Sequence, residues 1–176
     1  MAPSLNATLG GASANSYQDV ASATSYFANT LFEAQWTALS ADAKAQALIT
    51  ATQWLETLSY LGERNSTTQR LSWPREATSS KGIENDGTSI PFEILSAQAE
   101  LALALGTTPT ALTGDIGTTT TTGAPKRQKL DTLEVEYFAP YAPDTGALLQ
   151  RFRWLRPILG PWLINSSAQL VGRVRS

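Results

Sequence analysis

The side chains that perform most enzyme chemistry are missing from this sequence. Its 176 residues include no histidine and no cysteine, which excludes a Ser-His-Asp hydrolase, a cysteine nucleophile, a zinc finger and a disulfide framework. Glu93 and Glu100 are seven residues apart on a predicted helix and could do acid–base work or hold a metal. No further ligand accompanies them, so we interpret both as solvated helix-face charges. We expect no enzyme activity, no metal and no cofactor.

A second chemical candidate is the motif Trp73-Pro74-Arg75, which interrupts a polar loop over residues 62–89. An aromatic ring beside an arginine could stack on a base and hold a phosphate of a nucleic acid strand. The alternative is structural: Trp73 anchors the loop on the core, and Pro74 stiffens the anchor by fixing φ. A structureless loop of this length is uncommon in a compact domain. We therefore favour the anchor, and the stacking role stays open.

Basic residues are concentrated in the C-terminal third. Residues 1–125 carry 5 basic and 11 acidic side chains, whereas residues 126–176 carry 8 basic and 4 acidic ones. The basic third could bind nucleic acid, or it could bind the acidic surface of a partner or of an identical neighbour. The third interpretation is an uneven scatter of surface charge without a binding role. A chain pI of about 5.1 argues against a dedicated nucleic-acid binder. The candidate charged interface comprises Lys126, Arg127, Lys129, Arg151, Arg153 and Arg156.

Four helices are predicted to position these groups within one domain over residues 17–157. The first three cover residues 20–28 with Asp19 as N-cap, residues 41–58 with Ser40 as N-cap, and a segment from Ile90-Pro91 to a stop at Gly106. The fourth begins near residue 145 and is ended by Pro157. Each carries apolar residues at three- and four-residue spacing. The fold class is mainly α: a small four-helix bundle with one short strand or hairpin and an extended arm at each end.

One strand is predicted at about residues 133–137, where Leu133, Val135 and Tyr137 alternate with glutamates. Its backbone groups need a partner, and the sequence offers no second strand of similar quality. We therefore expect pairing with another subunit, which would close a ring or extend a filament. The threonine-rich loop before it, residues 107–125, is expected to be exposed.

Both ends of the chain are expected to lie outside the bundle. Residues 1–16 have almost no large apolar side chains and predict a flexible arm. Residues 158–176 predict an extended docking tail, because their large apolar side chains have no periodicity; these are Trp162, Leu163, Ile164, Leu170 and Val171. Trp162 would be the anchor in a pocket of the partner. A signal-peptide pattern is missing and the purest apolar run has five residues, so we expect a soluble intracellular protein without a membrane partner.

The order of these segments resembles a family of small tailed-phage proteins over about residues 16–156. That family is often labelled DnaT-like single-stranded-DNA-binding and is similar to the head-tail adaptor, or head completion, proteins of tailed phages. The matching positions are residues 17–27, Trp36, the Ala-rich helix at 44–55, Leu71-Ser72-Trp73-Pro74-Arg75, Ile90-Pro91, the strand with Lys126, Lys129, Leu133, Val135 and Tyr137, and Leu148-Leu149.

The resemblance implies a mostly helical structural protein without enzyme activity, placed at the head-tail interface of a virion and assembled in the host cytoplasm. It implies a ring of twelve copies that binds the portal protein and the tail or nozzle proteins. Duplex DNA would pass through the ring without specific binding. We expect acidic or neutral side chains in the lumen, because basic side chains would bind the phosphates and slow the passage of the DNA. The basic C-terminal third would then face protein. The alternative is the single-stranded-DNA-binding module of the family label, supported by the basic residues and by aromatics that could stack.

Overall fold

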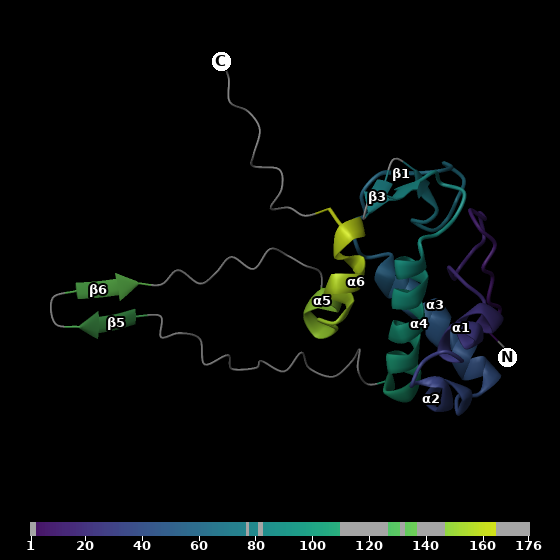
Figure 1. The fold of residues 1–176 in the computed structure, drawn as a ribbon, viewed down its shortest axis with the longest axis horizontal. Coiled ribbons are helices and arrows are strands. Elements are labelled where there is room, and N and C mark those ends of the chain that lie inside the picture. Colours follow the sequence, from purple (N-terminus) through teal and green to yellow (C-terminus); the bar gives the residue numbers. More distant parts are fainter. Residues whose placement is uncertain are drawn as a thin grey trace, which may run out of the picture.

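The computed structural model of the chain describes residues 3–76, 78–80, 83–109, 127–130, 133–136 and 147–164. The fold is mainly α with small hairpins, which confirms the predicted class (Figure 1). Its helices are α1 (Val20–Phe27), α2 (Glu33–Thr37), α3 (Ala41–Leu55), α4 (Phe92–Thr107), α5 (Ala147–Arg151) and α6 (Leu155–Leu159), followed by the 3-10 helix η2 (Gly160–Trp162).

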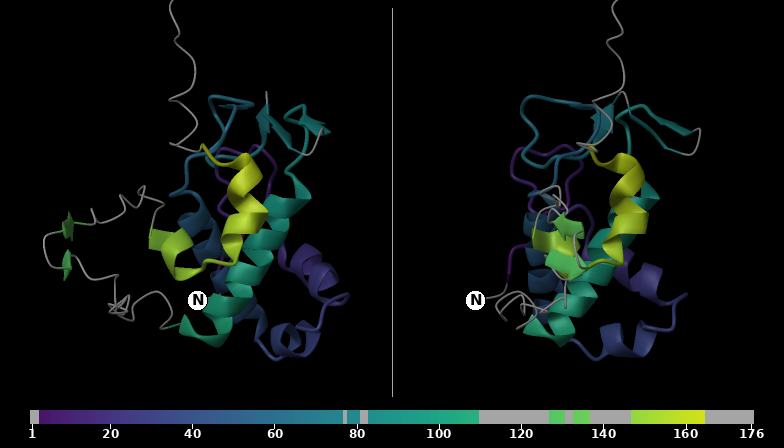
Figure 2. Two further views of the ribbon diagram at one scale, coloured as in Figure 1. Left: turned by 60° about the vertical axis from the view of Figure 1, so that its left-hand side comes forward. Right: turned by 90° about the vertical axis from the view of Figure 1, so that its left-hand side faces the viewer.

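Helices α3 and α4 form the centre of the core, and α6 lies along α4 (Figure 2). The sequence dictates where α1 and α3 begin. The Asp19 carboxylate accepts the backbone N–H of Ser22 at 2.7 Å, and Ser40 Oγ accepts that of Ala43 at 3.2 Å. Such caps satisfy backbone donors that have no partner within the first turn. The apolar stripes then meet in the core, where Leu48, Leu55, Ile94, Leu101, Leu155 and Leu159 are fully buried.

Two predicted helix ends differ from the structure. Gly106 lies inside α4, not beyond its end. A Cβ at this position would come within 2.7 Å of a methyl carbon of Leu39, so the glycine lets α4 approach that side chain closely. The fourth predicted helix is divided into α5 and α6 by residues 152–154. Pro157 stands in the first turn of α6, where its missing N–H costs nothing, so it does not end the helix.

The predicted strand pairs within its own chain. Strand β6 (Leu133–Glu136) is antiparallel to β5 (Arg127–Leu130), with Val135 opposite Gln128. This corrects the expectation of a lone strand, which failed because β5 lacks an alternating apolar pattern. Two residues separate the strands, a length that suits a hairpin. Figure 1 draws this hairpin apart from the helices. Tyr137 and Lys126 lie outside the described residues.

The loop over residues 62–89 contains four short strands at one end of the helices (Figure 1). Strand β1 (Glu63–Arg64) pairs with β2 (Arg75–Glu76), and β3 (Thr78–Ser80) pairs with β4 (Ile83–Asn85), both antiparallel. Strand β2 begins at Arg75, the last residue of the motif Trp73-Pro74-Arg75 that was expected to anchor the loop. The predicted loop over residues 107–125 lies outside the described residues from residue 110 onward.

Residues 3–16 pack against the domain, which differs from the flexible arm expected. Ala14 and Ser16 are 2% and 1% exposed. The Asn15 side chain accepts the N–H of Asn6 at 2.7 Å and donates to the carbonyl of Ser4 at 2.8 Å. Side-chain amides thus satisfy a backbone that has no regular structure. The segment needs no partner chain to order it.

The C-terminal segment up to residue 164 also belongs to the domain. Trp162 is 4% exposed and meets the ring of Trp73 edge-on, with centroids 5.6 Å apart. Backbone hydrogen bonds join this segment to the residues that follow α3: Leu61 donates to the carbonyl of Trp162 at 2.9 Å, and Ile164 to that of Ser59 at 3.0 Å. Trp162 therefore fills this chain's core, which corrects its expected role as an anchor in a partner. Leu163 is half-buried and Ile164 is exposed, while Leu170 and Val171 lie outside the described residues.

Candidate functional site

The motif Trp73-Pro74-Arg75 is built into the domain. Trp73 is 1% exposed and packs between the rings of Tyr60 and Trp162, with centroid distances of 5.5 and 5.6 Å. The bond between Trp73 and Pro74 is cis. A ring enclosed in this way offers no face to a base. The structure thus places Trp73 in the anchoring position and not in a stacking one.

Arg75 faces backbone carbonyls. Its Nε donates to the Leu61 carbonyl at 2.7 Å, and its Nη atoms donate to the carbonyls of Ser72 and Tyr60, both at 3.3 Å, and of Gly62. A guanidinium has five donors in a fixed fork, which suits it to gather several carbonyls at once. Arg75 therefore joins the end of α3 to the loop, and its donors are turned inward.

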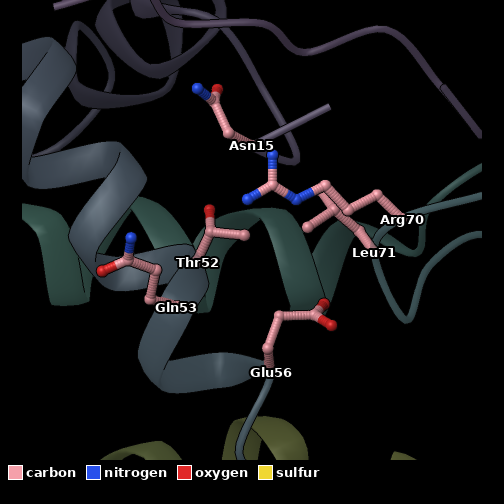
Figure 3. A pocket seen from close by; sticks show the side chains of 6 residues that line it. All are labelled: Asn15, Thr52, Gln53, Glu56, Arg70 and Leu71. Atoms are coloured by element: carbon pink, nitrogen blue, oxygen red, sulfur yellow. The ribbon is translucent and has the colours of Figure 1, made fainter. Parts of the chain in front are cut away.

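A polar cavity of about 230 Å³ lies between the N-terminal segment, α3 and the loop after β1 (Figure 3). The guanidinium of Arg70 extends across it between Asn15 and Thr52. At its border, Glu56 accepts the backbone N–H of Ser72 at 2.8 Å, the Ser72 hydroxyl at 3.0 Å and the hydroxyl of Tyr17. Burial, then nearby Tyr60 and Glu56, raise the pKa of Tyr17. The Glu56 carboxylate therefore holds three segments together.

Three arginines and an exposed tryptophan lie close together in sequence in the segment from α5 to α6. Arg153 and Arg156 are exposed, Arg151 is half-buried, and Trp154 is 39% exposed. The indole of Trp154 meets the buried ring of Phe152 edge-on, with centroids 6.1 Å apart. Sequence reasoning selected the three arginines and missed Trp154, although the alternation Arg151-Phe152-Arg153-Trp154 was a usable signal. Lys126 lies outside the described residues, and the structure does not describe the side chains of Arg127 and Lys129 in β5.

A groove of about 440 Å³ adjoins Trp154 between α2, α4 and α6. Trp154 and the 46% exposed Phe32 supply aromatic surface. Within the groove, Glu100 accepts the hydroxyl of Tyr26 at 2.6 Å, and burial and this carboxylate raise the pKa of Tyr26. Glu100 was expected to be a solvated helix-face charge, and the structure instead places it in a lined cavity. The groove is lined by Phe32, Gln35, Glu100, Leu103, Ala104, Thr107, Trp154 and Ile158.

Catalytic and metal chemistry has few candidates in the described part of the chain. There, no three acidic side chains come together as ligands for a metal ion. Among the helices of that part, none has the length and hydropathy of a membrane span. The Trp154 groove, with Arg153 and Arg156 outside it, remains as the candidate binding site.

Comparison with known proteins gives one match. The family model described as "Putative DnaT-like ssDNA binding protein" matches residues 5–175. Searches of curated proteins and of solved structures find no match. The matched segment includes the N-terminal segment, all described helices and the Trp154 groove. Because the match covers almost the whole length, the chain belongs to the family that carries the description "Putative DnaT-like ssDNA binding protein".

Proposed function

We propose that this protein is a non-enzymatic module that binds single-stranded nucleic acid. The observation that carries the proposal is the exposed Trp154 at the start of α6, with the exposed Arg153 next to it in sequence and the exposed Arg156 in α6. Proteins that bind single strands combine cationic groups for the backbone with aromatic faces on which bases stack. The family match supports this function over the adaptor role.

The distribution of charge supports a small contact. The charged side chains of helices α1 to α4 are mostly acidic, while the segment from α5 to α6 carries three arginines and no acid. A strand would therefore be attracted to one end of the domain and repelled from the rest. With two or three phosphates neutralised, the logarithm of the binding constant should fall with the logarithm of salt concentration with a slope of about −1.4 to −2.

Fluorescence anisotropy of labelled oligothymidylate tests the proposal. We expect binding at low salt that weakens with the slope given above, and weaker binding of a duplex of equal length, whose bases cannot reach an aromatic face. Matched titrations should use the full chain at several salt concentrations. Absence of salt-dependent binding at protein concentrations up to about 100 μM would overturn the proposal.

The second candidate is the head-to-tail adaptor of a tailed-phage virion, a twelve-copy ring that binds the portal and the tail or nozzle proteins. One observation favours it: Leu31 is 97% exposed and Phe92 is 68% exposed, and the nucleic-acid site uses neither. Large exposed apolar side chains suit contact with other chains. The order of motifs over residues 16–156 supports it as well. An unpaired strand and an exposed Trp162 do not support this role, because β6 pairs with β5 and Trp162 is buried.

Mass measurement of the purified protein, alone and mixed with portal protein, tests the adaptor role. The adaptor predicts a multiple of the 18.9 kDa chain mass, either free or on the portal. A monomer under both conditions would contradict it. The result is independent of strand binding, so the two candidates are separated by two different measurements.

A further inference from the structure

We infer that the Trp154 groove receives one unstacked nucleobase and prefers guanine. This inference rests on the proposed function and adds the site, the orientation of the nucleotide and its base preference. A volume of about 440 Å³ lies within the range of small-molecule sites, roughly 300–1,000 Å³. The aromatic side chains of Phe32 and Trp154 both line the groove. Apolar surface from Leu103, Ala104 and Ile158 completes a lining suited to a flat ring.

The charges at this site fix the orientation of a bound nucleotide. Glu100 lines the groove, whereas Arg153 and Arg156 do not. A carboxylate inside repels a phosphate, and arginines outside attract it. The base therefore enters the groove while its phosphates stay on the surface beside α6. This separation of charges distinguishes the groove from a site for a free phosphate.

The positions of the two arginines relative to Trp154 predict which of them contributes more to phosphate binding. Trp154 and Ile158 are four residues apart and so share the groove side of the helix. Leu155 and Leu159 face the core. Arg153 immediately precedes Trp154, whereas Arg156 is two residues beyond it and lies roughly half a turn around the helix. Arg153 is thus the nearer phosphate ligand.

Glu100 supplies the base preference. A carboxylate accepts hydrogen bonds only and has about four lone-pair sites, one of which the Tyr26 hydroxyl uses at 2.6 Å. Guanine presents two adjacent N–H donors on its Watson–Crick edge, so it can bind a carboxylate through two parallel hydrogen bonds. Thymine presents a single N–H between two carbonyl oxygens, which the carboxylate repels. Guanine should therefore be favoured by roughly tenfold, the discrimination typical of a good bidentate pair.

The test compares binding of oligothymidylate with that of the same oligomer carrying one central guanine. For the full chain we expect about tenfold tighter binding of the guanine-containing strand. Trp154→Ala should weaken binding of both strands by about tenfold or more, and Trp154→Phe should restore most of it. Phe92→Ala is the matched control, because it removes another exposed aromatic that does not line the groove. Arg153→Gln should weaken binding more than Arg156→Gln.

Glu100→Gln isolates the base contact. The amide keeps an acceptor for Tyr26 but loses the charge and the second acceptor, so the guanine preference should disappear while binding of oligothymidylate stays the same or improves. Equal binding of both strands by the unmodified protein would overturn the base preference.

The remaining outcomes separate the groove from the proposed function. If Trp154→Ala and Phe92→Ala behave alike while the unmodified protein still binds single strands, the groove assignment is wrong and the function stands. If the unmodified protein binds no strand, both fail. If Trp154→Ala instead lowers the mass of an assembled form without changing strand binding, the groove receives another protein chain and the inference is overturned.

Discussion

Glu56 connects three segments of the chain through one carboxylate. Its carboxylate accepts hydrogen bonds from Ser72 and Tyr17, which lie on the loop and next to α1. Glu56→Ala would leave the backbone N–H of the buried Ser72 and the buried phenol of Tyr17 without these partners. Each unsatisfied buried group costs about 1–3 kcal/mol, so we expect the free energy of unfolding to fall by roughly 2–4 kcal/mol. Urea unfolding measures this, with Gln53→Ala as an exposed control that lines the same cavity.

Arg75 is predicted to act on stability and not on ligand binding. Arg75→Lys keeps the charge but replaces a fork of donors with a single ammonium that cannot reach four carbonyls. We expect a loss of about 1–3 kcal/mol in the free energy of unfolding, measured by urea titration. The exposed Arg64, on the adjacent strand, provides the control Arg64→Lys. Unchanged stability combined with weaker strand binding would instead support the stacking role of Trp73-Pro74-Arg75.

Sequence reasoning at this scale succeeded where a residue's role is set by its neighbours in sequence. Trp73 interrupts a long polar loop beside a proline, and the structure places it in the core. Trp162 follows no helical period, because it lies in a 3-10 turn and its partner Trp73 is far away in sequence. Local pattern cannot reveal such a contact. Trp154 was missed although its alternation with arginines is visible in the sequence; the alternation marks it as a candidate, but its exposure follows from how α5 and α6 pack.

Among the elements, the N-cap of α1 gives a prediction about pH. The backbone N–H of Ser22 bonds the Asp19 carboxylate and holds its pKa below the ordinary value. Because the pKa is lower in the folded state, the cap stabilises the fold above the unfolded pKa of about 4, and this contribution is lost as pH falls through the folded pKa. Asp19→Ala should cost about 1 kcal/mol at neutral pH. Asp19→Asn should retain most of the cap and remove its pH dependence, which urea unfolding at pH 7 and pH 3 would show.

The helices were the most predictable elements, and their ends and pairings the least. Residues 20–28 and 41–58 were expected, and α1 and α3 cover Val20–Phe27 and Ala41–Leu55. Capping residues and apolar spacing are local, so they are visible in the sequence. Strand β5 has no such signal, since a two-stranded ribbon can be held by backbone hydrogen bonds alone. The break between α5 and α6 was likewise hidden, because Pro157 suits the first turn of a helix as well as an end.

At the scale of the whole molecule, the described residues from the N-terminal segment to residue 164 share one hydrophobic core. The expected arm and the expected tail both supply buried side chains, Ala14 and Trp162 among them. Charge remains divided between an acidic body and basic α5 and α6. A binding partner therefore meets a folded surface, and the arginines and Trp154 are held in place before it arrives. Such preorganisation lowers the entropy cost of binding.

Two deletions test this boundary of the domain. Removal of residues 165–176 leaves every described core residue in place, so the melting temperature should change little. Removal of residues 158–176 also takes away Leu159 and Trp162, which are 0% and 4% exposed. Loss of a buried Trp side chain alone costs about 3–5 kcal/mol, against a total stability of about 5–15 kcal/mol for a typical domain. The longer deletion should therefore unfold or melt at a far lower temperature, as near-ultraviolet circular dichroism would show.

If both variants melt alike, residues 158–164 act as a tail after all, and any loss of portal binding in the longer deletion could then be assigned to docking. If only the longer one unfolds, portal binding has to be tested with the shorter deletion, because a misfolded domain loses every partner at once.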